Sequence, residues 1–155
     1  MKGNDKVIAA LNALLSDELT AINQYMVHSE MCANWQFEKL HSMIEKRAID
    51  EMKHAEKHIG RILFLEGVPV VSNLKKMMIG PDVETQLAND QVAEIDAIRA
   101  YNEAIQLTVT CADNGTREML EDILEDEEEH LDWLEAQIDQ IRMLGIQNYL
   151  SEQVG

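Results

Sequence analysis

The sequence predicts an all-α protein, in which four long helices form a bundle with a long crossover between the second and third helices and a short fifth helix at the C-terminus. Apolar residues recur at the spacing of amphipathic helices through four long segments, and the alternation typical of strands is absent. Only 7 Gly and 2 Pro occur among the 155 residues, so few turns and long elements are expected. This length suits a single domain covering residues 1–155.

Apolar residues at helical spacing predict a first helix over residues 5–35 and, after a short break, a second over residues 38–66. Gly67 and Pro69 are expected to end the second helix, as a C-cap glycine followed by proline. The segment 68–81 is long for a connection between adjacent antiparallel helices. We therefore expect it to cross to the far end of the bundle.

A third helix is expected over residues 82–111, with Asn114 and Gly115 marking a stop after it. Thr116 is the expected N-cap of a fourth helix that ends near residue 145. A short fifth helix follows over residues 146–152. Four helices joined in this way run up, down, down and up.

The charge balance favours cations as partners. Acidic residues outnumber basic ones 29 to 13, for a formal net charge of −16. Such a surface repels polyanions, so no nucleic-acid partner is expected, and it concentrates metal ions. The two cysteines, Cys32 and Cys111, form no C-x-x-C pair, as is typical of a reducing cytosol. Neither a signal peptide nor a membrane-length apolar stretch is present, and we expect a cytoplasmic protein without a membrane partner.

An internal repeat singles out six side chains. The motif E-x-x-H, which places a glutamate and a histidine on one helix face, occurs at Glu51 and again at Glu127. Glu18 precedes Glu51 by 33 residues, and the same interval separates Glu94 from Glu127, 76 residues further along. Each half thus supplies one lone glutamate and one Glu-x-x-His pair. The six residues are Glu18, Glu51, His54, Glu94, Glu127 and His130.

A third copy of the motif does not follow the repeat. Glu38 and His41 have Asn114 and Arg117 as their counterparts at the offset of 76. We therefore assign no role to His41, and none to His28.

The six repeated residues predict a metal centre. Four carboxylates and two imidazoles are costly inside a bundle unless something pairs them. Two ions bridged by shared carboxylates would offset the four negative charges, and oxygen and nitrogen ligands without thiolate suit iron, manganese or zinc. The alternative is six surface or salt-bridged groups on acidic helices.

Residues 1–150 resemble the bacterioferritins. The matching segments are Asp17–Tyr25 (DELTAINQY), Ile49–Ala55 (IDEMKHA), Arg61–Gly67 (RILFLEG), Asp126–Glu135 (DEEEHLDWLE) and Gln147–Leu150 (QNYL). The resemblance implies a ferritin-like fold and a hollow homo-oligomer of 24 chains, built from dimers, that stores iron as a ferric mineral. It also implies that the six residues form a ferroxidase di-iron centre, which oxidises Fe(II) with O2 or H2O2.

In that family Glu51 and Glu127 bridge the irons, while Glu18 and Glu94 each bind one iron together with one histidine. Tyr25 lies seven residues beyond Glu18, and Tyr101 seven beyond Glu94. Each tyrosine is expected to hydrogen-bond the carboxylate of the opposite half. Tyr25 is assigned to the catalytic set as an electron donor, whereas for Tyr101 a structural role between packed helices is as plausible.

Met52 follows Glu51 and therefore points about 100° away from the metal face. Its counterpart in the repeat is Glu128, so its role is not duplicated within the chain. Packing at a helix interface is the ordinary role of such a methionine. The resemblance implies instead that Met52 and its copy in a second chain bind one haem b between two subunits, through which a ferredoxin reduces the stored iron.

Four further residues lie close in the sequence to the six predicted ligands. One of them differs from the pattern of the family. Lys46 stands where relatives often have a histidine that forms an inner-surface iron site with Asp50, so that site is not expected here. Asp50 and Asp126, each one residue before a ligand, are the acidic residues most expected to matter. His58 is interpreted as a packed or solvated histidine, with a role next to the ligands as the alternative.

Two other functions compete with iron storage. A di-iron peroxidase of the rubrerythrin kind is one, although those proteins usually carry a four-cysteine rubredoxin site and this chain lacks the C-x-x-C pairs. A purely structural bundle is the other. Buried carboxylates without metal would destabilise its core, which argues against it.

Overall fold

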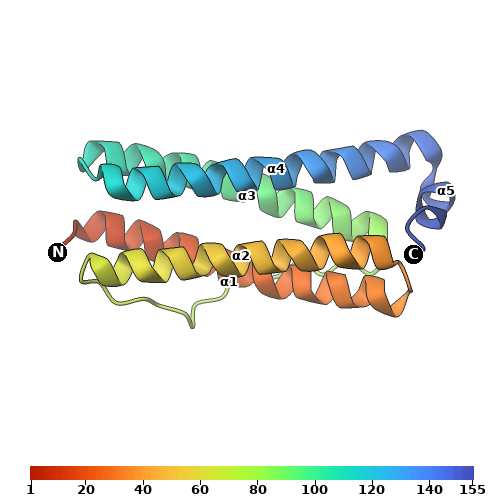
Figure 1. The fold of residues 1–155 in the computed structure, drawn as a ribbon, viewed down its shortest axis with the longest axis horizontal. Coiled ribbons are helices and arrows are strands. Elements are labelled where there is room, and N and C mark those ends of the chain that lie inside the picture. The colour runs from red at the N-terminus through yellow and green to blue at the C-terminus, as the bar shows by residue number, and fades with distance from the viewer.

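The computed structural model describes residues 1–155 as five helices and no strand. The helices are α1 (Asp5–Asn34), α2 (Glu38–Phe64), α3 (Val83–Thr110), α4 (Asn114–Leu144) and α5 (Ile146–Ser151). As Figure 1 shows, α1 pairs with antiparallel α2, and α3 with antiparallel α4, while the crossover runs along the outside of the first pair and connects the end of α2 to the start of α3. The predicted all-α bundle with its long crossover and short C-terminal helix is confirmed. No helix combines the length and apolarity that a membrane span requires.

The internal repeat extends to the chain reversals. α1 ends at Asn34 and α3 at Thr110, 76 residues apart, and α2 and α4 begin at equivalent positions. In both reversals the residue two beyond the helix end has positive φ, 64° at Gln36 and 55° at Ala112. The two halves therefore share their turn geometry as well as their ligand motif.

The end of α2 differs from the prediction. The helix ends at Phe64, and the left-handed residue after it is Glu66 (φ 63°), not Gly67. The Gly67 N–H donates to the Ile62 carbonyl (2.9 Å), as in a Schellman motif. Glycine is needed at 67 for space, because a Cβ there would lie 2.6 Å from Cγ2 of Ile8 on α1.

The predicted stop at Asn114-Gly115 and the predicted N-cap Thr116 are both wrong. Asn114 is the first residue of α4, and Asp113 is the N-cap, whose carboxylate accepts from the Thr116 N–H (3.0 Å) and hydroxyl (2.6 Å). Arg61, near the end of α2, donates to the same carboxylate (3.0 Å). Gly115 leaves room for this arginine, since a Cβ would lie 2.7 Å from its Nη2. The cap is thus selected by a contact between the two halves.

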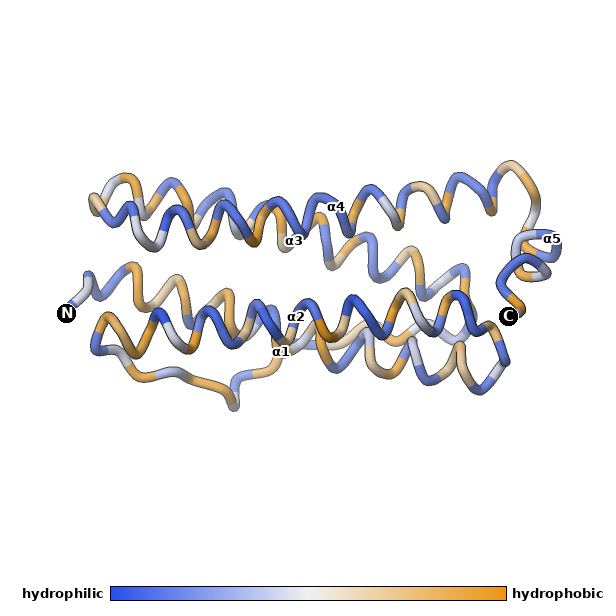
Figure 2. The backbone as a smooth tube through the Cα atoms, viewed as in Figure 1, coloured by the Kyte–Doolittle hydropathy of each residue, from blue (hydrophilic) through white to orange (hydrophobic).

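The apolar core has two parts, with buried polar residues between them. One cluster includes Val7, Leu11 and Ile62, and the other includes Cys32, Leu40 and Ile141. Figure 2 shows hydrophobic and hydrophilic residues alternating along each long helix, as expected for helices with one buried face. The glutamates and histidines of the repeat lie between the two clusters along α1, α2 and α4.

Polar side chains of α1 hold the crossover against the bundle. Thr20 and Gln24 accept from the Lys75 and Met78 amides (2.9 and 3.0 Å). His28, to which the sequence assigned no role, takes part in the same contact.

The buried His28 ring links the crossover to α3. Its Nε2 accepts from the Gly80 amide (3.0 Å), and its Nδ1 donates to Asp90 (2.9 Å). The Gln24 amide donates to the same carboxylate (2.9 Å). His28, to which the sequence analysis assigned nothing, therefore has a structural role, since it joins the crossover to α3.

Candidate metal centre

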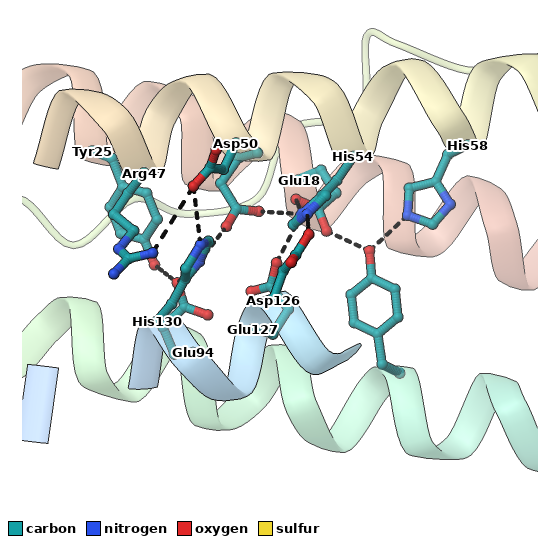
Figure 3. Close-up of polar contacts among 12 residues, drawn as sticks. Glu18, Tyr25, Arg47, Asp50, His54, His58, Glu94, Asp126, Glu127 and His130 are labelled. Atoms are coloured by element: carbon teal, nitrogen blue, oxygen red, sulfur yellow. Dashed lines mark hydrogen bonds and ion pairs between the residues drawn. The ribbon is translucent and has the colours of Figure 1, made fainter. Parts of the chain in front are cut away.

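The structure brings all six repeated residues together in the middle of the bundle. Each residue is no more than 2% exposed, and together they come from all four long helices. Figure 3 shows Glu18, His54, Glu94, Glu127 and His130 pointing toward one another between the helices. The alternative of six surface groups is therefore wrong, whereas ion pairs among the six do form, as between His54 and Glu127 (2.9 Å).

The six residues form two overlapping groups of four, in each of which one potential ligand atom per residue lies within 4.8 Å of the others. The first group is Glu18, Glu51, His54 and Glu127; the second is Glu51, Glu94, Glu127 and His130. Glu51 and Glu127 belong to both groups, whereas each of the other two carboxylates lies with one histidine. This is the geometry that two adjacent ions with two shared carboxylates require.

One atom of each residue is buried without a hydrogen-bond partner. The six atoms are Glu18 Oε2, Glu51 Oε1, His54 Nδ1, Glu94 Oε2, Glu127 Oε1 and His130 Nδ1. Buried polar atoms in folded proteins are nearly always paired. Six ligand-type atoms at one place that make no hydrogen bond, and of which five meet one another only as ion pairs, fit bound cations.

Each histidine is held by an aspartate of the other half. His54 Nε2 lies 2.8 Å from Asp126 Oδ2, and His130 Nε2 lies 3.3 Å from Asp50 Oδ2 (Figure 3). These contacts leave both Nδ1 atoms facing the carboxylates, with His54 Nδ1 2.9 Å from Glu127 and His130 Nδ1 3.2 Å from Glu51. Carboxylates that orient ligand histidines in this way are a common feature of metal sites.

The sequence singled out these two aspartates but missed their contact with the histidines. The recurrence of aspartate in both halves, at the offset of 76, was the feature of the sequence that could have predicted this contact. Arg47 also lies near Asp50 (3.9 Å) and over the Trp133 ring (5.8 Å).

The two tyrosines make the expected contacts across the halves. The Tyr25 hydroxyl donates to Glu94 Oε1 (2.6 Å), and the Tyr101 hydroxyl donates to Glu18 Oε1. His58 is fully buried, with Nε2 2.6 Å from the Tyr101 oxygen, so it is packed and not solvated. Burial lowers the pKa of His58 to about 4. The neutral ring donates through Nε2 and directs the tyrosine proton to Glu18.

Without metal, the centre retains protons. Burial raises the pKa of Glu51 well above its ordinary value, and the charges of Glu18 and Glu127 add to this. Burial and the nearby Glu94 raise the pKa of Glu127 in the same way.

Glu18, Glu94 and His54 keep their charged forms. Burial acts to raise the pKa of Glu18 and of Glu94, but contacts with a neighbouring glutamic acid and a histidine outweigh it and lower both. Burial acts to lower the pKa of His54, but Glu127 and Glu18 raise it to about 11. In the metal-free centre, protons on Glu51, Glu127 and His54 therefore offset part of the negative charge that bound cations would offset.

We expect the metal-free protein to lose stability as the pH rises from about 6.5 to 8, a range in which His58 is mostly neutral in both the folded and the unfolded chain. Glu51, Glu127 and His54 have raised pKa values in the folded state, so the folded chain binds more protons than the unfolded chain above their ordinary values of 4.5, 4.5 and 6.5. For each proton that the folded chain binds in excess of the unfolded chain, the free energy of unfolding falls by about 1.4 kcal/mol as the pH rises by one unit. Urea titrations in the presence of a chelator measure this slope. Saturating Zn²⁺ should reduce it, and a metal-free stability that rises over this range would contradict the assignment.

A cavity of about 310 Å³ leads to the centre between α1, α3 and the crossover. Asp17, Lys75 and Asp96 line its outer part, and Glu18 and Glu94 are among the carboxylates at its inner end. Lys75 forms an ion pair with Asp17 there. The cavity therefore joins exposed residues of α1, α3 and the crossover to the buried ligands.

Met52 lies outside the centre, as expected from its position on α2. Its side chain is 46% exposed, and Ile49, one turn earlier, is 42% exposed. Met26 on α1 is also exposed. The outer surface of α1 and α2 therefore presents thioether and apolar groups to the solvent.

The bundle with its crossover and its buried glutamate–histidine centre defines a ferritin-like protein. In agreement, residues 8–144 match the family model of the ferritin-like domain. A bacterioferritin of Rhodobacter capsulatus is 41% identical over 149 residues, which cover 96% of this chain and 92% of the relative. A bacterial ferritin of Paramagnetospirillum magnetotacticum is 40% identical, with 100% and 96% covered, and a bacterioferritin of Mycolicibacterium paratuberculosis is 38% identical, with 98% and 96% covered.

The chain belongs to the bacterioferritin family. Membership of this family supports a role in iron storage and metal binding.

Proposed function

We propose that the protein oxidises Fe(II) at the buried centre and deposits Fe(III) as a mineral inside a cage of 24 identical chains built from dimers. The observation that carries the oxidation step is the set of six buried ligand atoms, one from each repeated residue, that lack a hydrogen-bond partner. Iron is the substrate and the cargo of this reaction. O2 or H2O2 is the oxidant.

The ligand set favours oxidation of two ferrous ions together. Anionic oxygen ligands stabilise Fe(III) relative to Fe(II), so a pair of ions among four carboxylates loses electrons readily. Two Fe(II) release two electrons, which with two protons reduce O2 to H2O2 or H2O2 to two waters. Binding the ions displaces the protons held by Glu51 and Glu127.

The two overlapping groups suggest the role of each ligand. Glu51 and Glu127, common to both groups, would bridge the two ions. The remaining residues would bind one ion each, as Glu18 with His54 and as Glu94 with His130.

The hydrogen bond from Tyr25 to Glu94 puts its phenol next to the second group, where it would supply one of the two electrons to the oxidant when only one Fe(II) is bound, with its proton passing to Glu94. In the first group, Tyr101 would orient Glu18 through its hydrogen bond, and His58 would orient Tyr101.

The surface of α1 and α2 fits a haem shared between two chains. Met52 offers an exposed thioether, a soft axial ligand, with apolar Ile49 and Met26 exposed on the same helix pair. Met52 of each chain would hold one haem b across a subunit pair. The bound group would supply one-electron transfer, with a ferredoxin as the donor, so that stored iron is reduced and released.

A single domain and a cytoplasmic location complete the proposal. Both apolar clusters draw residues from all four long helices, which favours one folding unit over residues 1–155. Cys32 and Cys111 are free thiols, as suits a reducing compartment.

Aerobic addition of Fe(II) to the metal-free protein tests storage directly. We expect rapid oxidation and a particle that stays in solution with far more than two irons per chain, because a cage interior takes up the product. Iron per chain after gel filtration, together with the particle mass, is the measurement. Saturation at two irons per chain would instead support a di-iron peroxidase of the rubrerythrin kind.

A further inference from the structure

A second group of ligand-type side chains lies apart from the buried centre, where α1 ends and α2 begins. Glu30 comes from the last turns of α1, and His41 and Glu45 come from the first turns of α2. One ligand atom of each residue lies within 4.8 Å of the others. The counterpart of His41 in the repeat is Arg117 and not a histidine, so the sequence analysis assigned His41 no role. The partner that it faces, Glu30, comes from a different helix.

The His41 ring is held in one orientation by Ser29, whose side chain is buried. His41 Nδ1 lies 3.1 Å from the Ser29 carbonyl oxygen and 2.9 Å from its Oγ, and this Oγ lies 3.3 Å from the His41 carbonyl oxygen. A carbonyl only accepts, so these contacts are all satisfied when the Ser29 hydroxyl donates to the carbonyl of His41 and Nδ1–H donates to Ser29. The proton is then on Nδ1, and Nε2 is left as the metal-binding nitrogen.

Nε2 of His41 has no hydrogen bond, and its spacing from Glu45 fits an intervening ion. The distance from Nε2 to Glu45 Oε2 is 3.6 Å, too long for a hydrogen bond. Two ligands bound to one tetrahedral ion at about 2.1 Å each are about 3.4 Å apart. The two atoms are therefore placed as neighbouring ligands of one ion.

No basic side chain neutralises the two carboxylates. Glu30 forms no ion pair, and the only partner of Glu45 within 4.0 Å is His41 itself. The side chain of His41 is 20% exposed and that of Glu45 is 54% exposed, so ions from solution can reach them. The group thus combines unneutralised negative charge with one oriented imidazole.

We propose that Glu30, His41 and Glu45 form a second, surface site for a divalent transition-metal ion such as Zn²⁺ or Fe²⁺. One imidazole nitrogen and two carboxylate oxygens are a ligand set for this class of ion, since Mg²⁺ and Ca²⁺ prefer oxygen alone. Three protein ligands leave room for water, so the bound ion exchanges with solution. The site does not depend on the ferroxidase activity proposed for the buried centre.

Calorimetric titration of the metal-free, full-length protein with Zn²⁺, in excess Mg²⁺ to occupy sites made of carboxylates alone, tests the proposal. We expect His41→Gln and Glu30→Gln each to bind one Zn²⁺ fewer per chain than the wild type. The control Glu38→Gln, which changes an exposed glutamate one turn before His41, should bind as the wild type does. Ser29→Ala keeps all three ligands and should weaken this one binding event about 10- to 100-fold, as loss of an orienting partner does.

Circular dichroism confirms that each variant is folded, and two different ligand variants guard against a single folding defect. Unchanged Zn²⁺ stoichiometry in both His41→Gln and Glu30→Gln would overturn the proposal, as would equal loss in Glu38→Gln. Fe(II) oxidation by His41→Gln, measured in parallel, should match the wild type. Failure of the surface site is thereby separated from failure of the buried one.

Discussion

Replacing Glu51 with glutamine is expected to slow Fe(II) oxidation by at least about 100-fold while the bundle stays folded. Glu51 belongs to both ligand groups, so its loss affects both ions, and loss of even an indirect contact at a metal site typically costs 10- to 100-fold. The fold should survive because the raised pKa of Glu51 means that the metal-free centre already holds a neutral side chain there. Stopped-flow absorbance after mixing with Fe(II) and O2 measures the rate.

Glu56→Gln is the matched control, because Glu56 lies on the same helix and is exposed. It makes the same glutamate-to-glutamine exchange without touching the centre and should oxidise Fe(II) at the wild-type rate. If Glu51→Gln also retained that rate, oxidation would have to occur elsewhere in the protein. The same variant should flatten the dependence of metal-free stability on pH, because one of the groups with a raised pKa is then gone.

Replacing Met52 with leucine is expected to abolish haem binding and to leave Fe(II) oxidation intact. Leucine conserves the volume and apolarity of the exposed side chain but has no sulfur to bind the haem iron. Haem per chain, measured from the visible spectrum of the reduced protein, should fall from about one per two chains to near zero. Release of stored iron by a reductant acting through haem should slow to the same extent.

Met143→Leu is the control for this change, since Met143 is a strongly exposed methionine on α4. It should keep the haem spectrum. A haem band that persisted in Met52→Leu would assign the ligand to another residue. Because Met52 lies outside the buried centre, a parallel loss of oxidation would show that the two functions are not separate.

The helices and the six central residues could be predicted because both leave a periodic trace in the sequence. Helical spacing of apolar residues is a local property, and it placed every long helix within three residues of its observed bounds. The offset of 76 then selected the ligand-type residues from many acidic ones, since two related halves must repeat any group that meets at their common centre. The same offset distinguished Glu51 and Glu127 from the unrepeated motif at Glu38.

The errors at helix ends arose where a distant side chain decided the local geometry. Asp113 caps α4 in place of Thr116 because Arg61, from the other half, pairs with its carboxylate. Gly67 is required because Ile8 packs closely against it, and not because residue 67 adopts a left-handed conformation. Preferences of single residues at turns are small, so one contact across the bundle outweighs them.

By itself, the sequence determined the helical class, the order of the helices, the residues that meet in the middle and the acidity that favours cations. Only the tertiary structure decided which residues support those ligands: Asp126 beside His54, His58 behind Tyr101, and Glu30 opposite His41. The reason is physical. Periodicity shows which face of a helix is buried, but the rotation and axial register of neighbouring helices determine which side chains of two faces touch, and these depend on packing throughout the bundle.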